Sequence, residues 1–237
     1  EIWGEIARRY NSEIWVGGYD LLNEPVHYNG RQVRELQKRM SERIRDFDKN
    51  HILFVNGNYW SRAFEDLVPK FDDNMVWAFH YYSWMVNAPV SKNTIQYLID
   101  LRKNTNTPLW LGETGENSNE WFVQLRTLIE QNNIGWAWWN YKKIGTINAP
   151  VSSPTDPVYQ EILNYWGGSG SKPNFDRSLL GLNNMVENLK FENCDLRKDV
   201  VASLLSKDFQ AKGIPYKSYS IPGKVEFVDY DLGSLGV

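Results

Sequence analysis

The sequence has few residues that bind metals or cross-link a chain. Among 237 residues it has one cysteine, Cys194, and three histidines. A single cysteine excludes an intramolecular disulfide and a cysteine-based zinc site, and three histidines leave little scope for a histidine metal cluster.

The sequence also lacks an excess of charge and any long apolar run. Its formal net charge is −3 and its isoelectric point is about 5.7. This balance gives no electrostatic footprint for nucleic acid or for an anionic membrane. No apolar run approaches the roughly 20 residues of a spanning helix, so no membrane span is expected.

Aromatic side chains, in contrast, are abundant. The chain has 11 Trp, 13 Tyr and 10 Phe, and 42% of its residues are hydrophobic. This content suffices for a folded core and excludes disorder for most of the chain. Tryptophan at this density either fills a large core or provides flat platforms on which sugar rings stack.

From Glu13 to Leu163, short apolar runs alternate with amphipathic helical patterns. Such alternation is typical of a parallel sheet covered by helices, either a doubly wound sheet or a (β/α)8 barrel. The predicted strands are 14–22, 51–55, 75–82, 108–113 and 134–140, and the predicted helices are 31–50, 94–103, 120–131 and 158–166.

Two features favour the barrel. No apolar run is followed by the Gly-x-Gly-x-x-Gly turn of a dinucleotide site. Four of the five runs end in polar or ionisable residues, and barrel enzymes draw their catalytic groups from the C-terminal ends of several strands. The predicted fold class is therefore α/β, a (β/α)8 TIM barrel.

The chain is expected to hold only part of that barrel. Each βα unit takes roughly 31 residues, and eight units need about 250. The sequence starts within a helical pattern and stops without a terminating element, so we expect a fragment that carries the last five units. Strands 13–23 and 134–140 would then be the unpaired edges of an open sheet.

The pattern changes after 167–171, a glycine-serine stretch with the composition of a flexible linker. Helical periodicity returns over 175–189 and 196–209. The predicted domains are a partial catalytic barrel over 1–167, a linker with a helical extension over 168–220, and the truncated start of a β-rich module over 221–237.

Two glutamates, Glu24 and Glu113, stand at the ends of predicted strands. Either one alone would be read as a solvated loop carboxylate. Two carboxylates that face each other across a cleft are the machinery of glycoside hydrolysis, in which one donates a proton and the other attacks the anomeric carbon or activates water.

Four motifs in register resemble glycoside hydrolase family 5 over residues 13–166. They are Asn23-Glu24-Pro25 after a strand, His80-x-Tyr82 two strands later, Glu113 at the end of the next strand and Trp139 on the last. The resemblance implies a barrel fold and a retaining mechanism.

The resemblance also implies a role for each matching residue. Glu24 is the expected acid/base and Glu113 the expected nucleophile. Asn23 would bind the sugar 2-hydroxyl, Tyr82 would orient the nucleophile, and Trp139 would lie under the sugar. His80 would lie close to both glutamates, with a structural core histidine as the alternative.

Other residues near strand ends leave two interpretations open. His27 and Trp84 are candidates to line the substrate cleft, with loop packing equally compatible. Lys142 could bind a sugar hydroxyl or be solvated. Trp138 should point away from Trp139 and pack against helices if the strand is regular.

The sequence thus predicts a retaining endo-β-glycosidase, first of all an endo-β-1,4-glucanase acting on plant polysaccharide. The alternatives are a mannanase or xyloglucanase of the same clan, and a non-catalytic glycan-binding barrel fragment. Two carboxylates suffice for the reaction, so no cofactor is expected. The full-length protein is expected to be an extracellular or cell-surface monomer. The fragment itself is expected to be inactive. Residues 221–227 resemble the start of a family 6 carbohydrate-binding module.

Overall fold

The computed structural model describes residues 1–83, 90–207, 209, 218–220 and 222–224. The chain divides into two compact units. The first consists of residues 1–114 and 125–138, and the second of residues 115–124 and 139–237. The domain boundaries expected from the sequence at residues 167 and 220 stay predictions.

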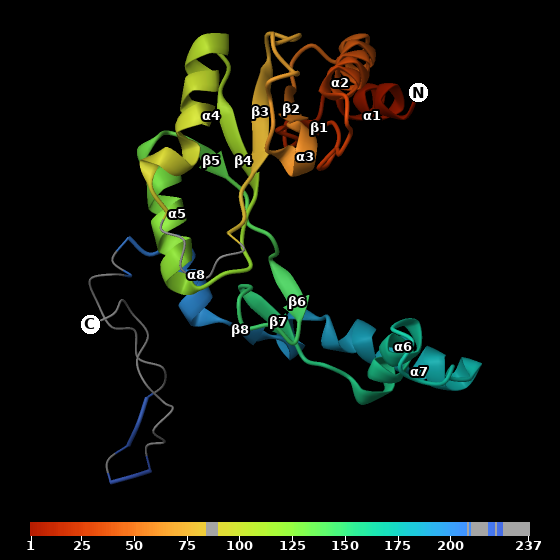
Figure 1. Cartoon of the computed structure of the whole chain (residues 1–237). Coiled ribbons are helices and arrows are strands. Elements are labelled where there is room, and N and C mark those ends of the chain that lie inside the picture. The colour runs from red at the N-terminus through yellow and green to blue at the C-terminus, as the bar shows by residue number, and fades with distance from the viewer. Residues whose placement is uncertain (84–89, 208, 210–217, 221, 225–237) are drawn as a thin grey trace. The chain divides into compact units, whose positions relative to one another are not determined.

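The first unit is built on one parallel sheet, whose five strands lie side by side in chain order (Figure 1). The strands are β1 (Gly18–Asp20), β2 (Ile52–Asn56), β3 (Met75–His80), β4 (Leu109–Glu113) and β5 (Gly135–Trp136). The helices that connect them are α2 (Gly30–Arg45), α3 (Asn58–Ser61), α4 (Lys92–Thr105) and α5 (Asn119–Gln131), and α1 (Ile2–Tyr10) precedes the sheet.

This sheet is part of a TIM barrel, as predicted. Parallel strands in sequential order with helical connections are the barrel's repeating unit. Within the part of the chain that the structure describes, β1 and β5 pair with β2 and β4 and not with each other. The expected open sheet is therefore confirmed.

Side chains alternate between the two faces of each strand. Leu53, Val55, Trp77 and Phe79 are almost completely buried, and Trp77 donates a hydrogen bond to Thr105 of α4. These residues therefore lie on the face that the helices cover. The intervening positions, which include Asp20, Asn56 and His80, lie on the opposite face.

A register shift in β3 makes His80 the partner of Glu113 in the neighbouring strand β4. The shift falls between Phe79 and His80, and it pairs His80 with Glu113 rather than with Gly112. Paired residues of parallel strands project from the same face. The shift therefore places His80, at the end of β3, beside Glu113, at the end of β4, on the face of the sheet opposite the helices.

Arg45 closes the N-terminal end of the sheet. Its guanidinium donates to both carboxylate oxygens of Asp72, at 2.8 and 2.9 Å. It also donates to the backbone carbonyls of Asp48, His51 and Asn74. One side chain at the end of α2 thereby holds the segments that lead into β2 and β3.

Asp48 lies in the turn between α2 and β2. Its carboxylate accepts hydrogen bonds from the Tyr19 hydroxyl (2.6 Å) and the His51 ring (2.5 Å), and from the backbone N–H groups of Asn50 and His51. Although burial raises the pKa of Asp48, these donors outweigh it and lower the pKa to about 2. The helix predicted over 31–50 is shorter than expected, since α2 ends at Arg45 and this turn follows it.

The two outer strands are much shorter than predicted, and β3 ends two residues before the end of the predicted strand 75–82. The run 14–22 forms a strand only over Gly18–Asp20, because the N–H groups of Glu13 and Val16 bond in turns before it. Ile14 and Trp15 are 84% and 88% exposed, so this part of the apolar run is not core. The run 134–140 forms a strand only over Gly135–Trp136.

The second unit contains a three-stranded sheet that the sequence did not predict. Its strands are β6 (Lys142–Ile144), β7 (Val151–Ser153) and β8 (Asp195–Leu196), with β6 parallel and β8 antiparallel to β7. The predicted helix 196–209 is correspondingly shorter, α8 (Lys198–Leu205). The helices α6 (Pro157–Trp166) and α7 (Phe175–Asn188) and the 3-10 turn η1 (Phe191–Asn193) complete the unit.

The glycine-serine stretch 167–171 connects α6 to α7, and its first residues are hydrogen-bonded to the end of α6. The N–H groups of Gly167, Gly168 and Ser169 bond to carbonyls of α6. Gly181 of α7 lies against α6, since a Cβ there would come within 2.9 Å of the Tyr159 backbone nitrogen. The two helices therefore pack directly on each other.

Two further predictions concern membranes and the C-terminal module. In the described ranges, none of the helices is long and apolar enough to cross a membrane. Residues 221 and 225–237, where the β-rich module was expected, lie outside the described residues.

Candidate active site

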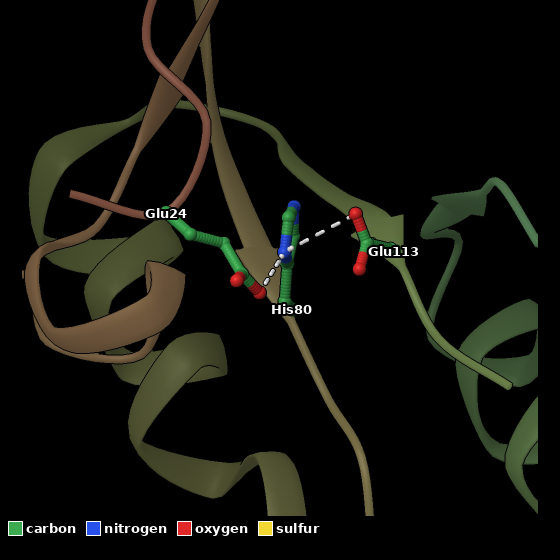
Figure 2. A group of neighbouring side chains, drawn as sticks. All are labelled: Glu24, His80 and Glu113. Carbon is green, nitrogen blue, oxygen red and sulfur yellow. Dashed lines mark hydrogen bonds and ion pairs between the residues drawn. The ribbon is translucent and has the colours of Figure 1, made fainter. Parts of the chain in front are cut away.

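Three ionisable side chains meet at the C-terminal ends of the strands. Glu24 comes from the loop after β1, His80 from the end of β3 and Glu113 from the end of β4. Figure 2 shows the His80 ring between the two carboxylates. Its Nδ1 lies 2.7 Å from Glu24 Oε1 and 3.9 Å from Glu113 Oε2. One nitrogen or oxygen atom from each of the three side chains lies within 4.8 Å of the other two.

The three side chains differ in their access to solvent. The His80 side chain is 3% exposed, whereas Glu113 and Glu24 are 20% and 26% exposed. A Cβ on Gly112 would lie 3.2 Å from His80 Nε2, so the glycine leaves room for the ring. The imidazole is therefore fixed in place while both carboxylates remain accessible to a ligand.

Tyr82 fixes the orientation of Glu113. Its hydroxyl donates to Glu113 Oε1 at 2.6 Å. The backbone adds two links, because the Tyr81 N–H donates to the Glu113 carbonyl and the Thr114 hydroxyl donates to the Tyr81 carbonyl. The end of β3 therefore holds Glu113 through both its side chain and its main chain.

Glu24 adopts a backbone conformation that is unusual for a residue with a side chain. Its φ is +46°, in the left-handed region. Asn23 precedes it in the same loop and is exposed. Strained residues of this kind persist only where the surroundings hold them, and they cluster at functional sites.

The remaining predicted residues do not all join this cluster. His27 is held within the loop after β1, where its N–H donates to Asn58, its Nδ1 accepts from the Asn29 N–H, and its ring packs on Tyr28. These contacts favour the loop-packing interpretation. Trp84 lies outside the described residues.

The predicted residues after β5 divide between the two units. Trp139 belongs to the second unit, is 48% exposed and bridges to Gly115. In the same unit, Lys142 donates to the Leu189 carbonyl. Trp138 belongs to the first unit and packs edge-to-face on Trp136, which donates to Glu130 of α5.

Two residues beside the cluster, Asp20 and Asn56, were not among the predicted site residues. Asn56 Nδ2 donates to Asp20 Oδ1 at 2.7 Å. Desolvation raises the pKa of Asp20, and the nearby His80 opposes this rise. The available signal was strand alternation, which places both residues on the same sheet face as His80.

This arrangement has two chemical capacities. Two accessible carboxylates with a short separation can hydrolyse a glycosidic bond. Glu24, His80 and Glu113 also offer one ligand atom each within a 4.8 Å span, so they could hold a metal ion.

Comparison with known proteins yields one family and a set of distant relatives. Residues 1–145 match the model of the cellulase family, glycosyl hydrolase family 5. The chain is 24% identical to Endoglucanase C of Acetivibrio thermocellus, over 69% of this chain and 64% of that protein. It is 32% identical to a β-xylosidase of Phanerodontia chrysosporium, over 68% of this chain and 41% of that protein.

A solved structure shows the same fold. Endoglucanase Cel5A of Thermotoga maritima superposes with a TM-score of 0.57 at 19% sequence identity, over 86% of this chain and 64% of that one. The chain thus spans less than two thirds of the length of these relatives.

Proposed function

The chain belongs to the cellulase family, glycosyl hydrolase family 5, and we propose that it carries the catalytic pair of a retaining endo-β-1,4-glucanase. The observation that carries the proposal is the close approach of the two carboxylates, since one oxygen of each lies within 4.8 Å of the other. The carboxyl groups of retaining enzymes are about 5–5.5 Å apart, whereas those of inverting enzymes are about 6.5–9.5 Å apart to admit a water, so this close approach favours a retaining pair.

In the first step, a Glu113 oxygen attacks the anomeric carbon and forms a glycosyl ester. The bond to the leaving oxygen breaks, and Glu24 donates its proton to that oxygen. The Tyr82 hydroxyl, 2.6 Å from Glu113 Oε1, keeps the attacking carboxylate in one orientation.

In the second step, Glu24 acts as a base. It removes a proton from a water molecule, the water oxygen attacks the anomeric carbon, and the bond to Glu113 breaks. Two inversions leave the anomeric configuration unchanged. His80, which donates to Glu24 Oε1 at 2.7 Å, holds this carboxylate through both steps.

Substrate contacts form a further part of the proposal. Asn23 would bind the 2-hydroxyl of the sugar at the cleavage point, and Trp139 would stack under that sugar. The proposed substrate is a β-1,4-glucan of plant cell walls. The names of Endoglucanase C and of the β-xylosidase agree with a β-linked polysaccharide.

A complete barrel needs three further βα units, and we propose that the parent polypeptide supplies them. The unpaired outer edges of β1 and β5 in the described sheet support this, together with the 64% coverage of Endoglucanase C. We further propose that the parent protein is an extracellular or cell-surface monomer, since its polymeric substrate cannot enter a cell.

The proposal predicts distinct behaviour for the two glutamates in the intact enzyme. The wild type should hydrolyse carboxymethylcellulose with retention, observed by proton NMR of the anomeric product. Glu113→Ala should abolish formation of the glycosyl-enzyme, observed by mass spectrometry, because no other group attacks the anomeric carbon. Glu24→Ala should still cleave dinitrophenyl glycosides in the first step, and added azide should restore turnover.

The control is Glu42→Ala, which removes an exposed glutamate of α2 that pairs with Lys38. It should leave both reactions unchanged. Equal losses in Glu24→Ala and Glu113→Ala on both substrate types, without azide rescue, would contradict the division of roles. Full activity in Glu113→Ala would remove the mechanism.

A further inference from the structure

Asn56 is a buried polar residue at the C-terminal end of β2. It is 0% exposed, and so is Gln37 of α2 beside it. The Asn56 N–H donates to Gln37 Oε1 at 3.1 Å, and Gln37 Nε2 donates to the Asn56 carbonyl at 2.8 Å. These paired bonds fix the backbone of Asn56 against α2, so its side chain projects from a rigid base.

The Asn56 amide connects three segments of the sheet's C-terminal end. Its Nδ2 donates to Asp20 Oδ1 at 2.7 Å. Its Oδ1 accepts from the Ser61 hydroxyl at 2.5 Å and from the backbone N–H of Glu24 at 3.4 Å. The contact to the Glu24 N–H is at the outer limit of hydrogen-bond length. The two shorter bonds, to Asp20 and Ser61, hold the Asn56 amide in position for this contact.

The chemistry of these partners permits one orientation of the amide. An ionised carboxylate only accepts hydrogen bonds and a backbone N–H only donates. If the Asn56 amide rotated by half a turn, its NH2 would face the Glu24 N–H and its oxygen would face Asp20. Asp20 therefore determines which atom of Asn56 meets Glu24.

The residue that Asn56 contacts is strained. Glu24 has a φ of +46°, and Ser61 has a φ of +58°. A left-handed conformation is unfavourable for a residue with a side chain and must be stabilised by its surroundings. The same oxygen of Asn56 binds both residues, so it stabilises two unfavourable turns at once.

We propose that Asn56, oriented by Asp20, is a positioning residue that holds the main chain of Glu24 so that its carboxylate reaches the leaving-group oxygen. This inference rests on the acid/base role proposed above for Glu24. A general acid must come within about 2.6–3.2 Å of the atom that it protonates. A displacement of about 1 Å can cost about 100-fold in rate.

The test is the dependence of kcat/KM on the leaving group, measured in the intact enzyme with a series of aryl cellobiosides. Phenyl cellobioside needs protonation of its leaving oxygen, whereas dinitrophenyl cellobioside does not. Asn56→Ala should lower kcat/KM about 100-fold on the phenyl substrate and less than about 3-fold on the dinitrophenyl substrate. Asp20→Asn keeps the shape but replaces the charged acceptor by a neutral amide, which accepts more weakly and can also present its NH2 to Asn56. It should give a smaller change of the same kind.

The matched control is Asn58→Ala. Asn58 is also buried and lies two residues further on, at the start of α3. Its side-chain amide forms hydrogen bonds with the backbone of His27 instead of Glu24. It should keep the leaving-group dependence of the wild type, whatever its effect on absolute rates. Should Asn56→Ala fail to fold, Asp20→Asn tests the positioning role by the same quantity, the loss of kcat/KM on the phenyl substrate relative to the loss on the dinitrophenyl substrate.

Two outcomes separate the proposals. If Glu24→Ala discriminates between the substrates and neither Asn56→Ala nor Asp20→Asn does, the positioning role is wrong and the catalytic role stands. If Glu24→Ala itself does not discriminate, the acid/base assignment is wrong. A loss of equal size on both substrates in Asn56→Ala would mean that the residue serves stability alone.

Discussion

The hydroxyl of Tyr82 orients the Glu113 carboxylate, to which it donates a hydrogen bond of 2.6 Å. A hydrogen bond to a charged group contributes about 1.5–3 kcal/mol. Tyr82→Phe removes this donor and keeps the ring, so Glu113 loses a constraint on its orientation. We expect kcat/KM on dinitrophenyl cellobioside to fall about 10- to 100-fold.

A matched substitution distinguishes this effect from a general loss of tyrosine hydroxyls. Tyr10→Phe changes a partly exposed residue of α1 whose ring packs under Arg9. Its kinetics should equal those of the wild type. If Tyr82→Phe were as active as Tyr10→Phe, the hydrogen bond would have no role in catalysis.

At the scale of elements, the turn between α2 and β2 depends on the charge of Asp48. The pKa of this carboxyl is lowered to about 2, mainly because hydrogen bonds from Tyr19 and His51 outweigh its burial. A group whose pKa is lowered on folding stabilises the fold above its unfolded value, about 3.9 for aspartate. That stabilisation, about 2 kcal/mol, should be lost as the pH falls from about 4 towards 2.

Hydrogen exchange measures this turn directly. The amides of Asn50 and His51 donate to Asp48 Oδ1. Their protection should decrease as the pH falls through this window, after correction for the intrinsic exchange rate. Asp48→Asn should already be less protected at pH 6 and should show a flatter dependence on pH. Parallel pH profiles in the wild type and in Asp48→Asn would refute the assignment.

Periodicity predicted the main elements because each has a face that packs against a core. The helices α4 and α5 begin and end within two residues of the predictions. The strands β2 and β4 begin and end within one residue of the predicted runs. Edge strands were overestimated, since the run 14–22 has a partner for only three of its residues.

Other features could not be predicted, for identifiable physical reasons. Strands of two or three residues, such as β6 and β8, are too short to show a period. The register shift at His80 depends on a neighbouring strand, so sequence order could not reveal that His80 pairs with Glu113. Strand ends indicated Glu24, His80 and Glu113, whereas Asn56 acts through partners from three other segments that only the fold brings together.

At the scale of the whole molecule, the open sheet leads to a prediction about assembly. The outer edges of β1 and β5 present unpaired backbone groups in the described part of the chain, and such edges promote association. Expressed alone, residues 1–237 should form concentration-dependent oligomers, measured by light scattering. Co-expression with the three βα units proposed to complete the barrel should give a one-to-one complex with glucanase activity.

The control for this experiment is the same co-expression with Glu113→Ala, which should assemble without activity. A chain that stays monomeric at all concentrations and hydrolyses β-glucan by itself would contradict the proposal that further units are needed. Assembly without activity in the wild-type pair would leave the barrel proposal intact and count against the catalytic assignment.

The clamp that Arg45 forms with Asp72 and three backbone carbonyls has a consequence for how such an enzyme can evolve. Its contacts lie where β2 and β3 begin, at the opposite end of the strands from Glu24, His80 and Glu113. In TIM barrels one end of the strands serves stability and the other serves chemistry. Loops at the catalytic end can therefore accumulate changes and explore new polysaccharides, while the unchanged opposite end keeps each intermediate sequence folded.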